Sequence, residues 1–134
     1  MYLSILTNAE KKLFLGLAYD LALSDGDYSA EEQATIQGYC REMQMEFDEK
    51  TMVKPIDDII QAFGKESDQK TKKIVVFESI GLAMADNNYD DNERAIVSNM
   101  ERTFGIDESF GVECEKVINE YISFQNRINN LVIG

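Results

Sequence analysis

Apolar residues recur every three or four positions through most of the chain, and this spacing is typical of amphipathic helices. The strict alternation of a half-buried strand is rare, and the chain contains one proline. We therefore predict helices over about residues 8–24, 30–43, 55–64, 67–86, 90–105 and 107–130. The expected fold class is all-α, a single compact domain over residues 1–134 with about six helices.

Short polar motifs mark where these helices begin and end. A Ser, Thr or Asp followed three residues later by Glu can form a capping box, in which each residue satisfies a backbone N–H of the first turn. Such a pair stands at the start of three predicted helices: Thr7/Glu10, Ser29/Glu32 and Asp90/Glu93. Pro55 suits the first position of a helix, and Gly64 and Gly105 are expected to end the helices that contain or precede them.

The chain contains an internal repeat. Residues 21–36 align over residues 82–97 without a gap, and the register continues to the pair Met45/Ile106. The identical pairs are Leu21/Leu82, Ala22/Ala83, Asp25/Asp86, Tyr28/Tyr89, Glu32/Glu93 and Ala34/Ala95. The repeat predicts two helix–acidic turn–helix units, over about residues 8–46 and 68–107, followed by a long helix over 108–130. A helical hairpin cannot bury its apolar face alone, so the two units are expected to pack on each other with pseudo-twofold symmetry.

The last helix has the longest apolar stripe. Its members are Phe110, Cys114, Val117, Tyr121, Phe124 and Ile128. We expect this stripe to pack across the core of the domain itself. The alternative is that the helix, with the apolar tail Leu131, Val132 and Ile133, packs between protomers.

Charge and composition exclude several classes of function. The chain has 25 acidic and 13 basic residues, a net charge of −12, which disfavours nucleic acid and anionic membranes and leaves basic proteins or hard cations as partners. It has no histidine, which excludes His-activated nucleophiles and His-ligated zinc or haem. Cys40 and Cys114 fall at apolar helical positions and are expected to be buried, reduced thiols. With no targeting segment and no apolar run of about 18 residues, we expect a cytoplasmic protein without a transmembrane segment.

The two acidic turns are the candidate site. Asp25 and Asp86 each follow the C-terminal end of a helix, where a carboxylate meets the negative end of the helix dipole. One explanation is an Asx-turn followed by a helix cap; the other is a cage of oxygen ligands for Ca²⁺ or Mg²⁺. An EF-hand is excluded, because counting from either aspartate gives no Gly at position six and no Glu at position twelve. Tyr28 and Tyr89 are expected to pack on the first turn of the helix that follows each cap.

At these turns the sequence resembles the TerB-like family, which includes tellurite-resistance TerB and the N-terminal region of DjlA-type co-chaperones. The first turn reads Ala-Leu-Ser-Asp-Gly-Asp-Tyr-Ser-Ala-Glu-Glu from residue 22, and the second reads Ala-Met-Ala-Asp-Asn-Asn-Tyr-Asp-Asp-Asn-Glu from residue 83. The resemblance covers about residues 9–125, and Asn87 departs from it by replacing a glycine. It implies a compact helical domain and nominates as metal ligands Asp25, Asp27, Glu32, Asp86, Asp90 and Glu93.

The expected function is a non-enzymatic interaction or adaptor module, with a role in stress response implied by the resemblance. Its partners would be a protein and divalent cations, Ca²⁺ or Mg²⁺, bound at the two acidic turns. Two alternatives stay open. One is a hydrolase in which carboxylates hold a metal ion without histidine, and the other is a purely structural or oligomerisation domain.

Overall fold

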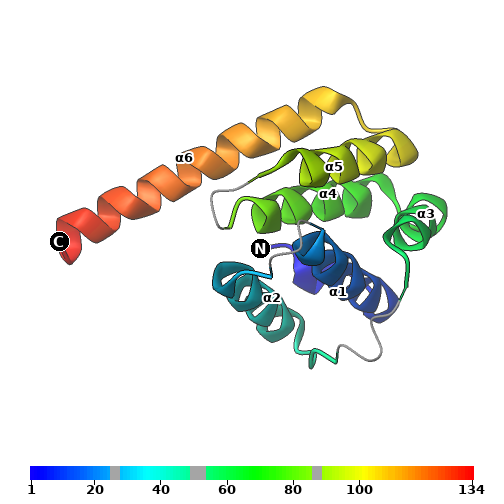
Figure 1. Cartoon of the computed structure of the whole chain (residues 1–134), viewed down its shortest axis with the longest axis horizontal. Helices are drawn as coiled ribbons and strands as arrows, with labels where there is room; N and C mark the ends of the chain where they lie inside the picture. Colours follow the sequence, from blue (N-terminus) through cyan, green and yellow to red (C-terminus); the bar gives the residue numbers. More distant parts are fainter. Residues whose placement is uncertain (25–27, 49–53, 86–88) are drawn as a thin grey trace.

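The computed structural model describes residues 1–24, 28–48, 54–85 and 89–134. Over these ranges the chain is all-α, as the sequence predicted, and no strand is formed. The elements are η1 (Leu3–Ile5), a short 3₁₀ helix, and the α-helices α1 (Asn8–Leu23), α2 (Ala30–Met43), α3 (Ile56–Glu66), α4 (Gln69–Ala83), α5 (Asp91–Phe104) and α6 (Glu108–Val132) (Figure 1). None of the helices in these ranges has the length and apolarity needed to cross a bilayer.

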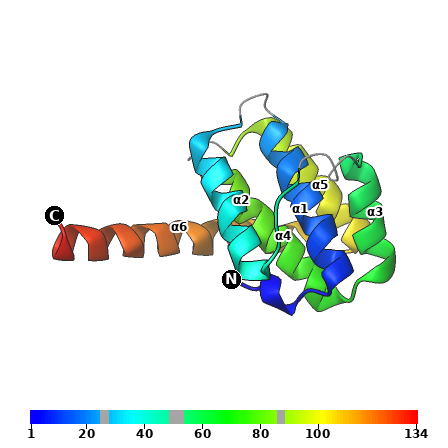
Figure 2. The ribbon, with the colours of Figure 1, turned by 90° about the horizontal axis from the view of Figure 1, so that it is seen from below.

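Helices α1 and α4 form the centre of the body. Helix α1 contacts α2, α3 and α4, and α4 also contacts α2, α5 and α6 (Figure 2). The helix–turn–helix unit α1–α2 therefore packs on the unit α4–α5 through the first helix of each. The equivalent residues Leu21 and Leu82 are both fully buried. Because α1 and α4 are covered on several sides, each carries a nearly continuous apolar run rather than a narrow stripe.

The repeat extends to the last turns of α2 and α5. Each helix is followed by a residue in the left-handed region, Gln44 with φ 55° and Gly105 with φ 68°. The next amide closes the same bond in both copies: Met45 N–H donates to the Cys40 carbonyl and Ile106 N–H to the Glu101 carbonyl, each at 2.9 Å. Glycine is the residue that tolerates this conformation best. In the first copy Gln44 adopts it without that advantage.

The predicted bounds of α3 were wrong at both ends. Pro55 is the N-cap rather than the first helical residue, and the helix continues through Gly64 to Glu66. Gly64 is small because α3 contacts α5 there: a Cβ added at Gly64 would lie 3.0 Å from the Thr103 Cγ2 atom. The glycine thus marks a close approach between helices and not a helix end.

The expected packing of the last helix across the core holds only for its first half. Only the first part of α6 packs on the body, through Gly111, Cys114 and Ile118. From residue 123 onward every residue is exposed, and the helix projects away from the other elements (Figures 1 and 2). The Phe124 side chain is 59% exposed and that of Leu131 is 85% exposed. The body ends before the helix does, so the second half of the apolar stripe has no surface of its own chain to cover.

Candidate functional site

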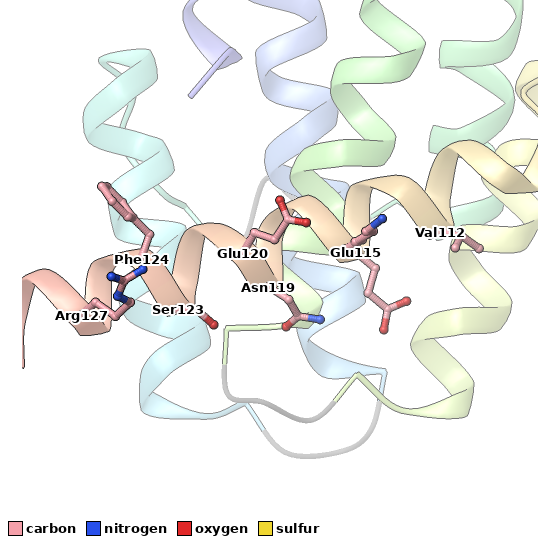
Figure 3. A pocket seen from close by; sticks show the side chains of 8 residues that line it. Val112, Glu115, Asn119, Glu120, Ser123, Phe124 and Arg127 are labelled. Carbon is pink, nitrogen blue, oxygen red and sulfur yellow. The ribbon is translucent and has the colours of Figure 1, made fainter.

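The helix ends that flank the two acidic turns lie at the same end of the body. The C-terminal ends of α1 and α4 and the N-terminal ends of α2 and α5 all lie there (Figures 2 and 3). We call this region, the described residues 24, 28–32, 85 and 89–93, the turn end. Three of the predicted metal ligands, Asp25, Asp27 and Asp86, lie outside the described residues. Asp90, Glu32 and Glu93 are described.

Both predicted capping boxes are formed at the turn end. The Glu32 N–H donates to Ser29 Oγ at 3.0 Å, and the Ser29 N–H donates to Glu32 Oε1 at 3.2 Å. In the second copy the Glu93 N–H donates to Asp90 Oδ1 at 2.8 Å, and the Asp90 N–H to Glu93 Oε1 at 3.2 Å. Glu32 and Glu93 are each only 1% exposed. Both glutamates therefore act first as buried capping residues that fix the start of the following helix.

The tyrosine before each cap is bonded to the following helix through its backbone carbonyl. The predicted packing of the ring on that helix is seen for Tyr89, whereas the Tyr28 ring packs edge-on against Tyr19 of α1, with centroids 5.6 Å apart. The Gln33 side-chain amide donates to the Tyr28 carbonyl at 3.0 Å, and Arg94 Nε donates to the Tyr89 carbonyl at 3.2 Å. The Arg94 guanidinium also lies over the Tyr89 ring, 4.0 Å from its centroid. Burial raises the pKa of Tyr89 to about 12. Both copies of the repeat therefore have a side chain that donates to the tyrosine carbonyl, and the second copy adds a cation–π interaction.

Arg94 bridges the turn end to the final helix. Its Nη1 and Nη2 atoms donate to the two carboxylate oxygens of Glu115 on α6, at 3.2 and 2.9 Å. This bidentate geometry is the strongest form of an arginine–carboxylate pair, although the pair is exposed to solvent. The turn end and the first half of α6 therefore contact each other through Arg94.

The described carboxylates do not by themselves form a metal site. Within residues 1–24, 28–48, 54–85 and 89–134, no group of three or more Cys, Asp or Glu side chains is close enough to hold an ion. Asp90 is half-buried, and its Oδ1 atom accepts the Glu93 N–H. Glu31 and Asp91 are exposed beside the caps. A cation site at this end would need ligands from the turns themselves.

A shallow hollow on the outer face of α6 is a different kind of feature. All of its lining residues come from α6: Val112, Glu115, Lys116, Asn119, Glu120, Ser123, Phe124 and Arg127 (Figure 3). No second element closes it, and six of its eight lining residues are polar or charged. It lacks the enclosed, apolar character of a small-molecule site.

Glu101 is a buried carboxylate that the sequence analysis missed. It is 4% exposed on α5, and its Oε2 atom accepts the Gly111 N–H of α6 at 3.1 Å. A Cβ added at Gly111 would lie 2.9 Å from the same oxygen. The signal was present, since Glu101 falls between Val97 and Phe104 on the apolar face of α5, and Gly111 interrupts the start of α6. This contact joins α5 to α6.

The two cysteines are buried thiols, as the sequence predicted. Cys40 and Cys114 are free and buried. Burial, with Glu101 and Glu113 nearby, raises the pKa of Cys114 to about 11. A thiol with so high a pKa is protonated and a poor nucleophile at neutral pH.

We expect Glu101→Gln to stabilise the protein at pH 7. Burial raises the pKa of Glu101 above its ordinary value of 4.5. The folded state therefore binds this proton more tightly than the unfolded state, and the stability it contributes is present below the unfolded pKa and lost as pH rises through the folded pKa. Glutamine is neutral and can still accept the Gly111 N–H.

Urea unfolding between pH 7.5 and 4.5 measures this effect. The advantage of Glu101→Gln over the wild type should shrink as pH falls toward 4.5. A variant that is less stable than the wild type at pH 7 would mean that the charged carboxylate itself stabilises the α5–α6 contact.

Comparison with known proteins identifies a solved structure with a similar fold. No protein-family model matches the sequence, and no curated protein matches it significantly. The crystal structure of a tellurite resistance protein from Nostoc punctiforme is similar, with a TM-score of 0.68 and 18% sequence identity over 97% of this chain and 84% of that one. At this identity the likeness concerns the fold. The chain therefore has the TerB-like fold of a tellurite resistance protein.

Proposed function

We propose that this chain is a non-enzymatic interaction module that binds a divalent cation and a protein partner at its turn end. The observation that supports the proposal is the gathering of four helix ends, two from each copy of the repeat, at one end of the body (Figure 2). The sequence puts Asp25, Asp27 and Asp86 in the turns between those ends, and Asp90 caps one of them. A role in stress response is proposed from the likeness to a tellurite resistance protein.

The electrostatics of the turn end favour a cation or a basic protein surface. The C-terminal ends of α1 and α4 direct their last carbonyl groups there, and these carry partial negative charge. Exposed Glu31 and Asp91 add to the negative potential, in a chain whose net charge is −12. Hard cations such as Ca²⁺ and Mg²⁺ prefer carboxylate and carbonyl oxygens.

The six candidate ligands have different parts in this proposal. Glu32 and Glu93 hold the N-termini of α2 and α5 through their capping boxes, so they position the turns. Asp25, Asp27, Asp86 and Asp90 are the proposed ligands. Asp90 would serve both purposes, because its Oδ1 atom caps α5 and a carboxylate has a second oxygen for a cation.

Thermal unfolding with and without millimolar Ca²⁺ or Mg²⁺ tests the proposal. A ligand that binds only the folded state stabilises it by RT ln(1 + [L]/Kd), about 1.4 kcal/mol at ten times Kd. We expect the melting temperature to rise with the cation, and Asp25→Asn/Asp86→Asn to abolish the rise. Absence of any shift with Ca²⁺, Mg²⁺, Mn²⁺ or Zn²⁺ would refute the cation-binding half of the proposal.

Asp90→Ser separates capping from cation binding. Serine caps the equivalent helix in the first copy, so this variant should keep its stability without cation to within about 0.5 kcal/mol and lose part of the cation-induced shift. The matched control is Asp68→Ser, because Asp68 caps α4 in the same way, accepting the Thr71 N–H at 2.8 Å, at the opposite end of that helix. An equal loss in both variants would indicate a general effect of net charge.

A further inference from the structure

An apolar groove lies along the first half of α6, between this helix, α4 and the N-terminal segment. Its volume is about 820 Å³, and its apolar walls include Tyr2, Ile5, Phe77, Phe110, Val117 and Tyr121. Hydrogen bonds and a ring contact fix the N-terminal segment, which forms the wall of the groove opposite α6. The Tyr2 N–H donates to Glu78 at 3.0 Å, and the Leu3 N–H to Glu42 at 2.8 Å. The Tyr2 ring also packs edge-on against that of Phe77.

The groove continues into the exposed half of α6. The apolar residues of this helix follow a heptad spacing, alternately three and four residues apart, at positions 110, 114, 117, 121, 124, 128 and 131. The first four of these residues line the groove. The last three, Phe124, Ile128 and Leu131, are 59%, 44% and 85% exposed. One seam therefore runs from the body to the end of the helix.

The exposed half of α6 also differs from the rest of the chain in charge. Arg127 is the one charged side chain in residues 121–134 of a protein whose net charge is −12. Two copies of this segment would approach each other without the repulsion that the acidic body imposes. A seam of heptad spacing with little charge is typical of a helix that pairs with another helix.

We propose that two copies of this chain pair antiparallel through α6, each placing the end of its helix in the groove of the other. In this register Tyr121 of one copy packs beside Phe124 of the second copy, and Val117 beside Ile128 of the second copy. Leu131 then packs beside Cys114 of the second copy, within the groove. The overlap covers residues 114–131, about 26 Å of helix on each side.

The charges beside the seam fit this antiparallel register. Glu120 and Arg127 are seven residues apart, about two helical turns, and therefore occupy the same heptad position. Both are exposed along α6 near Phe124 (Figure 3). In an antiparallel pair of helices, residues at this heptad position lie beside residues at the same heptad position of the partner helix. Glu120 of each copy therefore lies beside Arg127 of the other. The contact is reciprocal and gives two opposite-charge pairs. Such pairs set partner choice and orientation in paired helices.

A parallel pair fits the same residues poorly. It would place two bodies, each with a net charge of −12, side by side at one end. It would set Glu120 beside the uncharged Gln125, so that neither copy gains an opposite-charge pair. It would also leave both grooves without the Leu131 and Ile128 side chains.

Sedimentation equilibrium of the full chain and its charge variants tests the proposal. We expect a dimer for the wild type and a monomer for Leu131→Asp. Arg127→Glu should weaken the dimer roughly 10- to 30-fold, since it replaces two attractive pairs with two repulsive ones. Glu120→Arg/Arg127→Glu should restore the wild-type affinity. Lys116→Glu makes the same change in charge on the outer face of α6 and should leave the affinity unchanged.

Three results would overturn the proposal. The first is a wild-type chain that stays monomeric at several hundred micromolar, which would leave the groove to a different protein. The second is failure of the double charge reversal to rescue Arg127→Glu. The third is rapid disulfide formation between the two copies of Cys114 under oxidation, which requires parallel pairing. None of these outcomes bears on cation binding at the turn end.

Discussion

Phe14→Ala is expected to lower the free energy of unfolding by about 3–5 kcal/mol, the usual cost of deleting a buried aromatic ring. The Phe14 side chain on α1 is completely buried. Its ring packs edge-on against Tyr39 of α2, with centroids 5.3 Å apart, so the substitution opens a cavity inside the first helix–turn–helix unit. Urea denaturation followed by circular dichroism measures the loss.

Phe124→Ala is the matched control, because it deletes the same ring from the exposed half of α6. At protein concentrations low enough to keep the chain monomeric, we expect a change below about 0.5 kcal/mol. A loss comparable to that of Phe14→Ala would mean that α6 folds back onto its own body, as the sequence pattern alone had suggested.

Removal of both caps at the turn end is expected to have the second-largest effect. Ser29→Ala and Asp90→Ala should each cost about 1 kcal/mol, because each leaves an N–H of the first helical turn without its side-chain acceptor. The two caps belong to different helices and share no hydrogen-bond partner, so the double variant should lose about 2 kcal/mol. The same urea denaturation measures it.

The conservative exchange Ser29→Asp provides the control for the caps. It installs in the first copy the residue that caps the second, and should leave the free energy of unfolding within about 0.5 kcal/mol of the wild type. A double alanine variant as stable as the wild type would contradict the assignment of Ser29 and Asp90 as the capping residues of α2 and α5.

The parts of the fold that the sequence predicted are those set by local chemistry. The bounds of α2 agree with the prediction at both ends, because Ser29 and Glu32 determine its start. The start of α5 follows equally from Asp90 and Glu93. A capping box involves residues three apart, so one sequence carries the whole signal.

The parts it missed depend on contacts between elements. Gly64 was expected to stop α3, whereas the close approach of Thr103 from α5 accounts for it. Glu101 was hidden because its partner, the Gly111 N–H, belongs to another helix. The apolar stripe of α6 predicted the length of the helix and its apolar face. Periodicity alone does not show whether the same chain or another chain covers such a face.

The candidate site was predicted in the same uneven way. The sequence identified the two turns and their caps, and the helix ends that flank them lie at one end of the body (Figure 2). It also proposed Glu32 and Glu93 as ligands, although each has an Oε1 atom that accepts a cap N–H. A residue-type pattern does not separate these two uses, since capping and cation binding both select acidic oxygens.

In the proposed function the two acidic turns act together as one cation site. A titration of the ¹⁵N-labelled chain with Ca²⁺, followed by amide chemical shifts, tests it most directly, because the Ser29 and Asp90 amides report on the two caps separately. We expect both amides to shift with the same midpoint, while the Thr71 amide at the cap of α4 stays in place. Shifts confined to one turn, or spread evenly over exposed carboxylates, would contradict it.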